Sequence, residues 1–595
     1  MKHNLKILAS VFLRFLVLLF LLRVIFLTVN REMFANFRLE DWFIGAYIDA
    51  ATLGMTLFPF VVLFLFPLPS MMHSWRSKLM VGYVLLLAFL FIVSGFMDTA
   101  YFSYLGKRVS FGYLIFMFTN PDTNAVAGDF IMEFWWLLLL LVFVIYSTYR
   151  WLIRPFKMEW IPVNSISSWA ALVVFTALSI FVGRGGWRLK PVHTVDAAGM
   201  TSLENSYGVV NLPFVLLKTQ DLSGIRLEEV IPEEEALRLT RVSRVLGKKS
   251  ILPKGTNVVI LILESFSGYY VGPEEKESFT PFLDSLSQTS LYFPYALANA
   301  STSMDAIPAI TSGLPTWMEE TFILSEFNVN CFEGLPRILK EYGYSSSFYH
   351  GAKTGSMFFD SFAKTAGFDV YSGKEQYPDQ RHDDGNWGIW DHHYLPWYAQ
   401  QLSQHKQPFV STTFTLSSHH PFFVPKSHEK LLRKGSDPLM RTINYTDMSL
   451  RDFWTMAKKQ AWFNNTLFIF VADHVGPTQR TDKKKLVDLF EIPILIHHPK
   501  MDLSALKKGE EFQQIDILPT VVDALGVNRK VSCFGRSYFS ERGRPKWIYR
   551  NGQVYRYESN KAWKVRKSTP KPDERFALAQ LQLYQKYLME NNLCP

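Results

Sequence analysis

Residues 257–265 read NVVILILES, an unbroken apolar run that stops at a glutamate and a serine. Residues 467–474 read LFIFVADH and follow the same plan, ending in an aspartate and a histidine. Apolar runs of this length are typical of strands that are buried on both faces of a sheet. Ligands of open α/β sheets gather at the carboxyl ends of the strands. Glu264, Asp473 and His474 are therefore the first candidates for a functional site.

The sequence around these two runs alternates between strand and helix patterns. Three further apolar, β-prone segments are strand candidates: Ser345–Tyr349, Phe409–Thr415 and Ile492–Ile496. Helical patterns lie between them, and such alternation is typical of βαβ units. From residue 257 onward we therefore predict an α/β domain with a mostly parallel central sheet.

The chain has 595 residues, of which 48% are hydrophobic and only 19% are charged. This length allows about three or four structural units. The net charge of +9 is scattered rather than gathered in a basic stripe, so nucleic-acid binding is not expected. The cysteines, Cys331, Cys533 and Cys594, allow at most one disulfide and exclude a disulfide-rich scaffold.

The amino-terminal third carries the long apolar runs. Five stretches are long enough, or nearly so, to cross about 30 Å of hydrocarbon as helices. They are Ile7–Val29, Phe43–Phe66, Leu79–Tyr101, Phe130–Tyr149 and Ile166–Val182. We therefore predict a five-helix transmembrane domain over residues 1–183, a juxtamembrane helical linker over 184–250 and an exported domain over 251–595. Asp49 falls within the second stretch, where a carboxylate is either functional or placed at a cavity or interface.

Basic residues in the short loops predict the orientation. Lys2 and Lys6 flank the first stretch, Arg76 and Lys78 precede the third, and Arg150 follows the fourth. Loops rich in Lys and Arg stay on the cytoplasmic side. With five spans, everything after about residue 183 then lies outside. The prediction is a multi-pass protein of the plasma or inner membrane with an extracytoplasmic domain.

The polar residues after the two decisive strands have the chemistry of a metal site. Glu264 offers a carboxylate, and Asp473 and His474 add a second carboxylate and an imidazole. Such ligands suit one divalent cation. The alternative is a polar turn after each buried strand, since strands commonly end in turn residues.

A cluster of hydroxyl residues lies between the two strands. Residues 299–315 read NASTSMDAIPAITSGLP, a Ser/Thr group followed by an apolar helical run. Taken alone, this pattern is typical of a helix N-cap. In the order strand–hydroxyl cluster–strand, however, the sequence resembles the alkaline phosphatase and sulfatase superfamily. The segments 514–520 and 523–526 resemble a further signature of that superfamily.

Apolar stretches before such a domain make the chain similar to the lipoteichoic acid synthase family, with phosphoethanolamine transferases as near relatives. Supporting segments are Tyr349-His350-Gly351, Asn386–Asp391 and Ser418–Phe422. The resemblance implies a sulfatase-like fold for the exported domain. It also implies metal ligation by Glu264, Asp473, His474 and a nucleophilic hydroxyl, with Mn²⁺ or Zn²⁺ as the ion and Mg²⁺ possible.

Two residues compete for the nucleophile. Ser303 has the family spacing to Asp305 and Pro308, whereas Thr302 has the residue type that is usual in the family. The spacing favours Ser303, and both residues offer an alcohol.

The resemblance assigns two histidines to the substrate. His419 matches the histidine near the transferred head group, where it would assist proton transfer, and His350 is a second candidate for substrate binding. The alternative for His419 is a surface His-His-Pro turn. In lipoteichoic acid synthases an aromatic and an arginine follow the position of His350, but residues 357–359 here read MFF. This departure weakens the expectation of a phosphoglycerol substrate.

The resemblance implies a two-step transfer. The hydroxyl takes the head group of a membrane phospholipid, with phosphoglycerol favoured, and passes it to a hydroxyl of an envelope glycolipid or glycan. A phosphoethanolamine transferase acting on lipid A or an envelope glycan is the first alternative. Sulfatases place Pro and Arg two and four residues after the nucleophile, but Asp305 and Ile307 stand there. A sulfatase-type hydrolase is therefore disfavoured, and a non-catalytic envelope-binding module is the remaining alternative.

Overall fold

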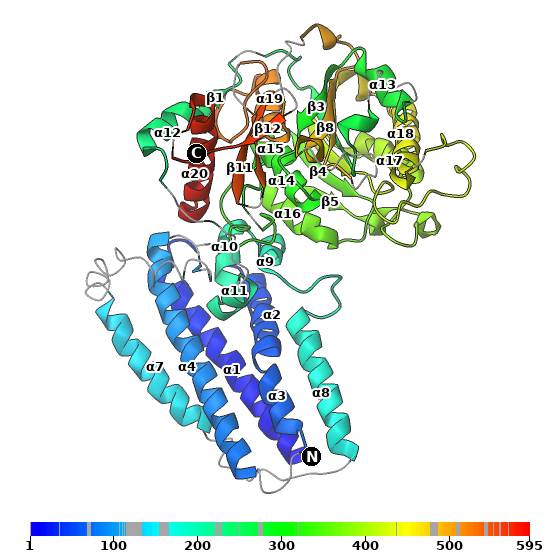
Figure 1. The fold of residues 1–595 in the computed structure, drawn as a ribbon. Coiled ribbons are helices and arrows are strands. Elements are labelled where there is room, and N and C mark those ends of the chain that lie inside the picture. Colours follow the sequence, from blue (N-terminus) through cyan, green and yellow to red (C-terminus); the bar gives the residue numbers. More distant parts are fainter. Residues whose placement is uncertain are drawn as a thin grey trace. The chain divides into compact units, whose positions relative to one another are not determined.

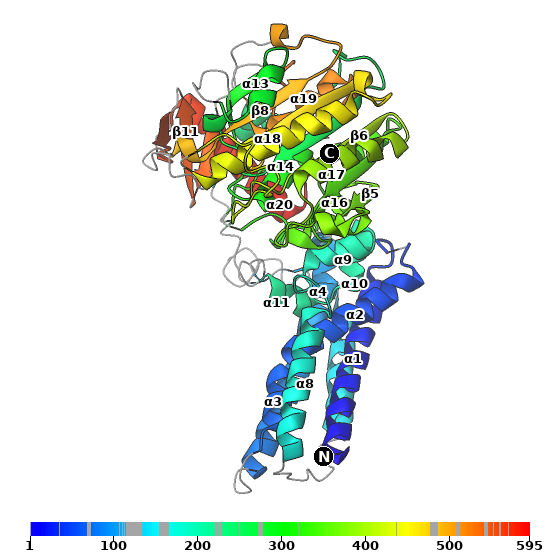
Figure 2. The ribbon, with the colours of Figure 1, turned by 90° about the vertical axis from the view of Figure 1, so that its right-hand side faces the viewer.

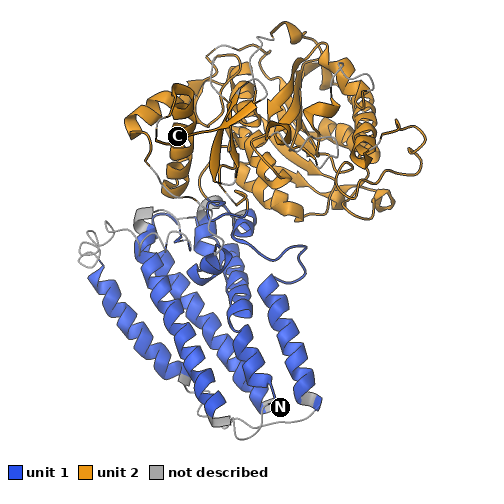
Figure 3. Cartoon of the chain, viewed as in Figure 1, with its two compact units in different colours: residues 1–223, 324–329 blue, residues 224–323, 330–595 orange. Residues whose placement is uncertain are grey.

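The computed structural model shows two compact units. The first comprises residues 1–223 with 324–329, and the second residues 224–323 with 330–595 (Figure 3). The structure describes all residues except 1, 35, 68–72, 106–107, 110, 112–113, 115–133, 154–165, 220–224, 226–228, 249, 272–277, 319, 436, 477–485, 507–511, 541–545, 551, 559–560, 569 and 595. The predicted linker 184–250 is divided between the two units, because its short helices pack with different partners.

The described part of the first unit is helical (Figure 1). Its long helices are α1 (Lys2–Val29), α2 (Leu39–Thr56), α4 (His73–Leu105), α7 (Trp135–Ile153) and α8 (Ile166–Arg184), and the short α3 (Phe58–Leu65) follows α2. Short helices follow: α9 (Thr194–Met200), α10 (Leu203–Val209) and α11 (Leu212–Lys218). Aliphatic and aromatic side chains of α1, α3 and α4 form its main core, while exposed leucines, valines and aromatics on α7 and α8 form an apolar outer surface.

The predicted count of five membrane spans is not confirmed. Among the described residues, three helices are long and apolar enough to cross a membrane, or four if α2 and α3 count as one span. These two helices are bent by 51°, and Pro59 in the first turn of α3 explains the break because it donates no backbone N–H. The described apolar helix Ser168–Arg184 is shorter and extends about 25 Å at 1.5 Å per residue, and residues 130–133 of the fourth stretch lie outside the description.

Asp49 on α2 is explained by a buried ion pair. Its Oδ1 lies 2.7 Å from Nη2 of Arg23 on α1, and both side chains are almost fully buried. Asn211 donates a further hydrogen bond of 2.8 Å to Asp49. Arg23 also donates to the carbonyls of Gly208 and Val209 at the end of α10. The structure thus gives Asp49 a structural role, because it neutralises an arginine that holds α10 against α1.

The second unit contains the predicted α/β domain. Its strands are β1 (Ser243–Leu246), β2 (Asn257–Leu263), β3 (Leu291–Leu297), β4 (Ser345–His350), β5 (Val370–Ser372), β6 (Phe409–Phe414), β7 (Thr466–Ala472), β8 (Glu491–His497), β9 (Arg529–Ser532), β10 (Lys546–Arg550), β11 (Gln553–Glu558) and β12 (Lys561–Lys564). All the strand candidates named from the sequence are present as β2, β4, β6, β7 and β8. Burial of these apolar runs on both faces of the sheet offsets the conformational entropy that is lost when the strands become ordered.

The central sheet has seven strands in the order β3-β8-β7-β2-β6-β4-β5. The strands β7, β2, β6, β4 and β5 pair in parallel, whereas β8 is antiparallel to both of its neighbours. The prediction of a mostly parallel sheet is therefore confirmed. Leu263 at the end of β2 pairs with Ala472 at the end of β7, so Glu264 and Asp473 emerge side by side at the carboxyl edge.

Helices cover the sheet (Figures 1 and 2). They are α13 (Pro281–Ser287), α14 (Ser303–Ser312), α15 (Leu335–Lys340), α16 (Phe359–Ala366), α17 (Asp391–Gln401), α18 (Pro438–Ala457) and α19 (Ile517–Ala524). The helices α13 and α17 each pack on α18, while α14 packs on α15, α16 and α19. The sheet thus lies between two helical layers, as in other α/β proteins with parallel strands.

A smaller carboxyl-terminal part completes the second unit. The strands β10, β11 and β12 form an antiparallel sheet, and α20 (Pro572–Glu590) packs on β11 and on α12 (Glu233–Thr240). Cys331 and Cys594 form a disulfide, and the third cysteine, Cys533, is free and buried. The bridge ties the chain end after α20 to the segment that precedes α15.

Candidate metal and nucleophile site

The site is built at the carboxyl edge of the two central strands. Glu264 follows β2 and Asp473 follows β7, and both side chains are almost fully buried. Ser265, between the two, has a φ of 61°. This left-handed conformation, which non-glycine residues rarely adopt, lets its backbone N–H donate to Oδ1 of Asp473 and its hydroxyl donate to Oε1 of Glu264. Strain of this kind is typical of functional sites.

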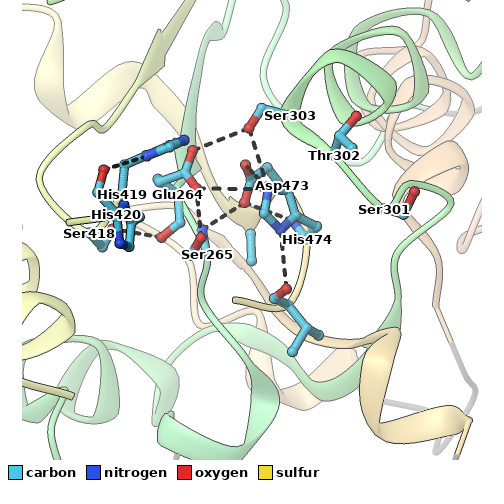
Figure 4. Close-up of polar contacts among 12 residues, drawn as sticks. Glu264, Ser265, Ser301, Thr302, Ser303, Ser418, His419, His420, Asp473 and His474 are labelled. Atoms are coloured by element: carbon cyan, nitrogen blue, oxygen red, sulfur yellow. Dashed lines mark hydrogen bonds and ion pairs between the residues drawn. The ribbon is translucent and has the colours of Figure 1, made fainter. Parts of the chain in front are cut away.

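Three ligand-type side chains converge at this edge. Glu264, Asp473 and His474 bring their ligand atoms within 4.8 Å of one another, the one such group among the described residues. Nε2 of His474 lies 3.2 Å from Oδ2 of Asp473 and 3.7 Å from Oε1 of Glu264. The predicted convergence of these residues is therefore observed (Figure 4).

The electrostatics of the group suit a bound cation. Burial, and next the negative charge of Glu264, raise the pKa of Asp473 to about 7. Burial alone would lower the pKa of His474, but Asp473 and Glu264 outweigh it and raise that pKa above its usual value. Two carboxylates buried side by side repel each other, and His474 beside them supplies at most one positive charge. Oδ2 of Asp473 accepts no hydrogen bond, although Nε2 of His474 lies 3.2 Å away. A divalent ion would balance the charge and give this oxygen a partner.

The structure separates the two candidate nucleophiles. Ser303 is the first residue of α14, and its Oγ donates to Oε2 of Glu264 over 3.2 Å and lies 3.4 Å from Nε2 of His474. Thr302 is one residue earlier, and its hydroxyl donates to Oδ2 of Asp305 over 2.9 Å. In Figure 4 the side chain of Ser303 points towards Glu264 and His474, while Thr302 and Ser301 lie to one side.

Helix α14 places Ser303 at its amino end. Backbone N–H groups at this end have no partner within the helix and favour negative charge nearby. Gly313 ends the helix in a left-handed conformation with a φ of 59°, which a glycine adopts without strain. The Ser/Thr cluster is thus an N-terminal helix signal and also brings one hydroxyl to the acidic group.

His419 lies on the loop that follows β6. The hydroxyl of Ser418 donates to the carbonyl of Glu264 over 2.6 Å, which ties this loop to the acidic group. The ring of Trp387 lies 3.8 Å from the ring of His419, and its indole N–H donates to the carbonyl of His420. Burial lowers the pKa of His419 below its usual value. A neutral imidazole is therefore held at the edge of the site.

His350 lies in the interior of the second unit. It is the last residue of β4, and its side chain is fully buried. Its ring packs against Phe359 and Phe414, and its Nδ1 lies 3.2 Å from the hydroxyl of Tyr371. Burial lowers the pKa of His350 to about 3. The histidine therefore occupies an aromatic part of the core, where its Nε2 forms no hydrogen bond.

Two residues around the site, Gln514 and Arg550, were not named as site residues from the sequence, although Gln514 opens the signature segment 514–520. The side chain of Gln514 donates to the carbonyls of Ala472 and Asp473 and accepts from the backbone N–H of Asn299, which ties three segments together. Arg550, at the end of β10, lines a cavity beside His474. An exposed arginine in a short hairpin carries no sequence signal for such a position.

Comparisons with known proteins agree with this architecture. A family model described as Sulfatase matches residues 256–527. The chain is 25% identical over 325 residues to the lipoteichoic acid synthase-like YvgJ of Bacillus subtilis, an alignment that covers 51% of this chain and 52% of that protein. It is also 25% identical over 347 residues to a lipoteichoic acid synthase of Staphylococcus saprophyticus, with 53% of each covered. The chain thus matches about half the length of these relatives.

A solved structure shares the fold. It is a protein of the alkaline phosphatase superfamily from Vibrio parahaemolyticus, with a TM-score of 0.51 and 24% identity. The match covers 61% of this chain and 98% of that one. Residues 256–527 therefore match the Sulfatase family model, and the α/β unit of this chain shares its fold with that protein.

Proposed function

We propose that the protein transfers the head group of a membrane phospholipid to an acceptor hydroxyl through a covalent intermediate on Ser303. One observation carries this proposal: the Ser303 hydroxyl lies 3.2 Å from Glu264 and 3.4 Å from His474, in a group that can hold a metal. A hydroxyl in that position is the usual nucleophile of group-transfer enzymes that form covalent esters. The apolar helices of the first unit support a lipid substrate.

A divalent ion held by Glu264, Asp473, His474 and Ser303 would stabilise negative charge on the serine oxygen and on the phosphate. Mn²⁺ and Zn²⁺ suit this mixture of oxygen and imidazole ligands, and Mg²⁺ suits it less well because of the histidine. Glu264 accepts the hydrogen bond of Ser303, which orients the hydroxyl before the reaction.

The reaction has two balanced steps. In the first, a new bond joins the Ser303 oxygen to the phosphorus, the bond to the lipid breaks, and diacylglycerol leaves with a proton. In the second, an acceptor hydroxyl bonds to the phosphorus, the bond to Ser303 breaks, and the proton of the acceptor returns to the serine. His419, neutral at pH 7 and beside the site, is the group that we propose to move these protons.

Phosphatidylglycerol is the donor we favour, and the acceptor is an envelope glycolipid or glycan on the extracytoplasmic side. The relatives named lipoteichoic acid synthase support this choice of donor. A single disulfide in the exported unit also contrasts with the several that phosphoethanolamine transferases typically contain. A tethered catalytic unit near the leaflet raises the effective concentration of a lipid donor.

The test uses the full-length protein in detergent micelles with phosphatidylglycerol or phosphatidylethanolamine and either Mn²⁺ or Zn²⁺. Released diacylglycerol is measured for the wild type, for Ser303→Ala and for chelator-treated protein. We expect metal-dependent release from phosphatidylglycerol that Ser303→Ala abolishes. Release from phosphatidylethanolamine alone would change the donor, and equal release by Ser303→Ala would refute the proposed nucleophile.

A further inference from the structure

Four histidines of the second unit pack together outside the site described above, and we call them the histidine cluster. His382 ends the short helix η6 (Gln380–His382), His392 and His393 lie in the first turn of α17, and His428 lies between β6 and α18. Ring centroids are 3.6 Å apart for His382 and His393, 3.9 Å for His392 and His393, and 4.3 Å for His392 and His428. All four residues are partly exposed, so ions in solution can reach them.

Hydroxyl groups occupy one nitrogen, Nδ1, in three of the four rings. The pairs are His382 with Tyr377 at 2.7 Å, His392 with Tyr445, and His428 with Ser427 at 3.0 Å. Histidines that bind a metal typically use their other ring nitrogen for a hydrogen bond to an oxygen, which orients the ring. Nε2 of these rings is then the nitrogen left for an ion, and a carboxylate oxygen of Asp379 lies 3.7 Å from Nε2 of His382.

The rings must turn before they can hold an ion together. Among the described residues, three ligand atoms lie within 4.8 Å of one another only at Glu264, Asp473 and His474. Bonds from a metal to imidazole nitrogens measure about 2.0–2.1 Å, so the ligating rings must be near neighbours, as the rings of the cluster already are. Partly exposed side chains change rotamer within about nanoseconds. Rotation of side chains, without movement of the backbone, therefore suffices to bring the nitrogens together.

The rings of the cluster also have the protonation state that a metal requires. Burial, and next the neighbouring His393, His428 and His382, lower the pKa of His392 to about 3. A neutral imidazole keeps the lone pair that binds a metal. Imidazole is a preferred ligand of zinc, copper and nickel, whereas Mg²⁺ and Ca²⁺ prefer oxygen.

We propose that the histidine cluster is a second metal site, which binds a transition-metal ion such as Zn²⁺ through imidazole nitrogens. It shares no residue with the group of Glu264, Asp473 and His474, and it does not depend on the proposed transfer reaction.

An ion at the cluster would join three segments near His419. The carbonyl of His382 accepts a hydrogen bond from the backbone N–H of Trp390, and Asp383 pairs with Ile389. His382 therefore begins the hairpin that carries Trp387 to the ring of His419. The ion would tie this hairpin to the first turn of α17 and to the segment that contains His428. The cluster thus has a positioning role and no direct role in the chemistry.

The test counts zinc ions in full-length protein that has lost the first site. Asp473→Asn/His474→Asn is dialysed against Zn²⁺ in detergent micelles, and bound zinc is measured by inductively coupled plasma mass spectrometry. We expect one ion per chain, and none after His392→Asn and His428→Asn are added. The matched control adds His405→Asn, because His405 lies beside Tyr349 and outside the cluster; it should keep the ion. An excess of Mg²⁺ should not displace the zinc.

Two further measurements keep the result decisive should the combined variant fold poorly. His428→Asn alone changes a partly exposed residue and should weaken zinc binding by at least about tenfold. X-ray absorption at the zinc edge of Asp473→Asn/His474→Asn should show at least three nitrogen neighbours at about 2.0–2.1 Å. Zinc should also raise the unfolding temperature of this variant, because the ion binds the folded state.

Absence of zinc from Asp473→Asn/His474→Asn would overturn the second site. Zinc that binds as tightly after loss of His392 and His428, or that shows a shell of oxygen neighbours, would be an adventitious ion only and would overturn it as well. Diacylglycerol release by the wild type is measured separately, so failure of the second site and failure of the proposed function are distinguishable.

Discussion

The hydroxyl oxygen of Ser303 lies 3.2 Å from Oε2 of Glu264, although 39 positions separate the two residues in the sequence. Glu264 is fixed by the end of β2 and Ser303 by the first turn of α14. The contact is therefore made by rigid elements rather than by loops, as a preorganised site requires. This contact distinguishes the hydroxyl of Ser303 from those of its neighbours Ser301 and Thr302.

Thr302 provides the first prediction. Thr302→Ala removes a hydroxyl that donates to Asp305 and not to Glu264. The rate of diacylglycerol release should therefore stay within about threefold of the wild-type rate. Ser303→Ala removes the proposed nucleophile and should lower the rate by at least about a thousandfold. Steady-state rates of diacylglycerol release by both variants, measured at saturating lipid, show which hydroxyl is the nucleophile. A large loss in Thr302→Ala with a small one in Ser303→Ala would exchange the two roles.

Metal affinity should depend on pH. Burial and Glu264 raise the pKa of Asp473 to about 7, so below this pH the ion must displace a proton. We expect the apparent affinity for Mn²⁺ to rise by about tenfold per pH unit for each proton released below pH 7, and to level off above it. Isothermal titration in two buffers of different ionisation enthalpy measures the number of protons. No proton release at pH 6 would contradict the prediction.

The same raised pKa predicts the pH dependence of stability without metal. The folded state holds a proton on Asp473 that the unfolded state releases near pH 3.9, so this residue lowers the stability as the pH rises from there to about 7. Asp473→Asn removes the charge and should flatten the profile of unfolding temperature in the presence of chelator. The exposed Asp502→Asn is the control. A steeper decline with Asp473→Asn would refute the assignment.

The disulfide should stabilise the second unit. Cys331 and Cys594 are separated by 263 positions, and loss of a native bridge costs about 2–5 kcal/mol. We expect Cys331→Ser, Cys594→Ser and the double variant to lower the unfolding temperature equally, because each breaks the same bond. Cys533→Ala changes a free cysteine and should be much milder. Additive losses in the double variant would show that the bridge does not form.

The buried ion pair in the first unit gives a further prediction. Asp49→Ala leaves Arg23 buried without its counter-charge and should destabilise the protein by about 3–5 kcal/mol. Asp49→Asn keeps a hydrogen-bond acceptor and should be milder. Glu40→Gln, at the exposed start of α2, is the control. Thermal unfolding in detergent measures all three, and equal stability of Asp49→Ala and wild type would exclude a structural role for the pair.

The sheet could be predicted because its signal is local. Apolar runs such as residues 257–263 are buried on both faces, and the polar residue after each run marks the carboxyl edge. The register of β2 and β7 then brings Glu264 and Asp473 together, because Leu263 pairs with Ala472. The strand β3 was missed because Pro294 interrupts its pattern, and its pairing with β8 shifts in register between Phe293 and Ala296.

Other features depend on tertiary contacts that no local pattern encodes. Thr302 has extended backbone just before α14, whereas Ser303 is the first residue of the helix. The change of backbone conformation at this point, and not the residue type, separates the two hydroxyls. His350 follows a strand motif but points into a cluster of aromatic residues. Arg550 reaches the cavity beside His474 only because β10 packs there.

The mass of the protein after one turnover shows whether Ser303 carries the transferred head group. Full-length protein is incubated with the metal ion and phosphatidylglycerol without acceptor, quenched in acid, digested and mapped by mass spectrometry. We expect a phosphoglycerol ester on Ser303 that is absent from Ser303→Ala and from chelator-treated protein. An unmodified Ser303 with an ester on Thr302, or diacylglycerol release without any protein adduct, would contradict it.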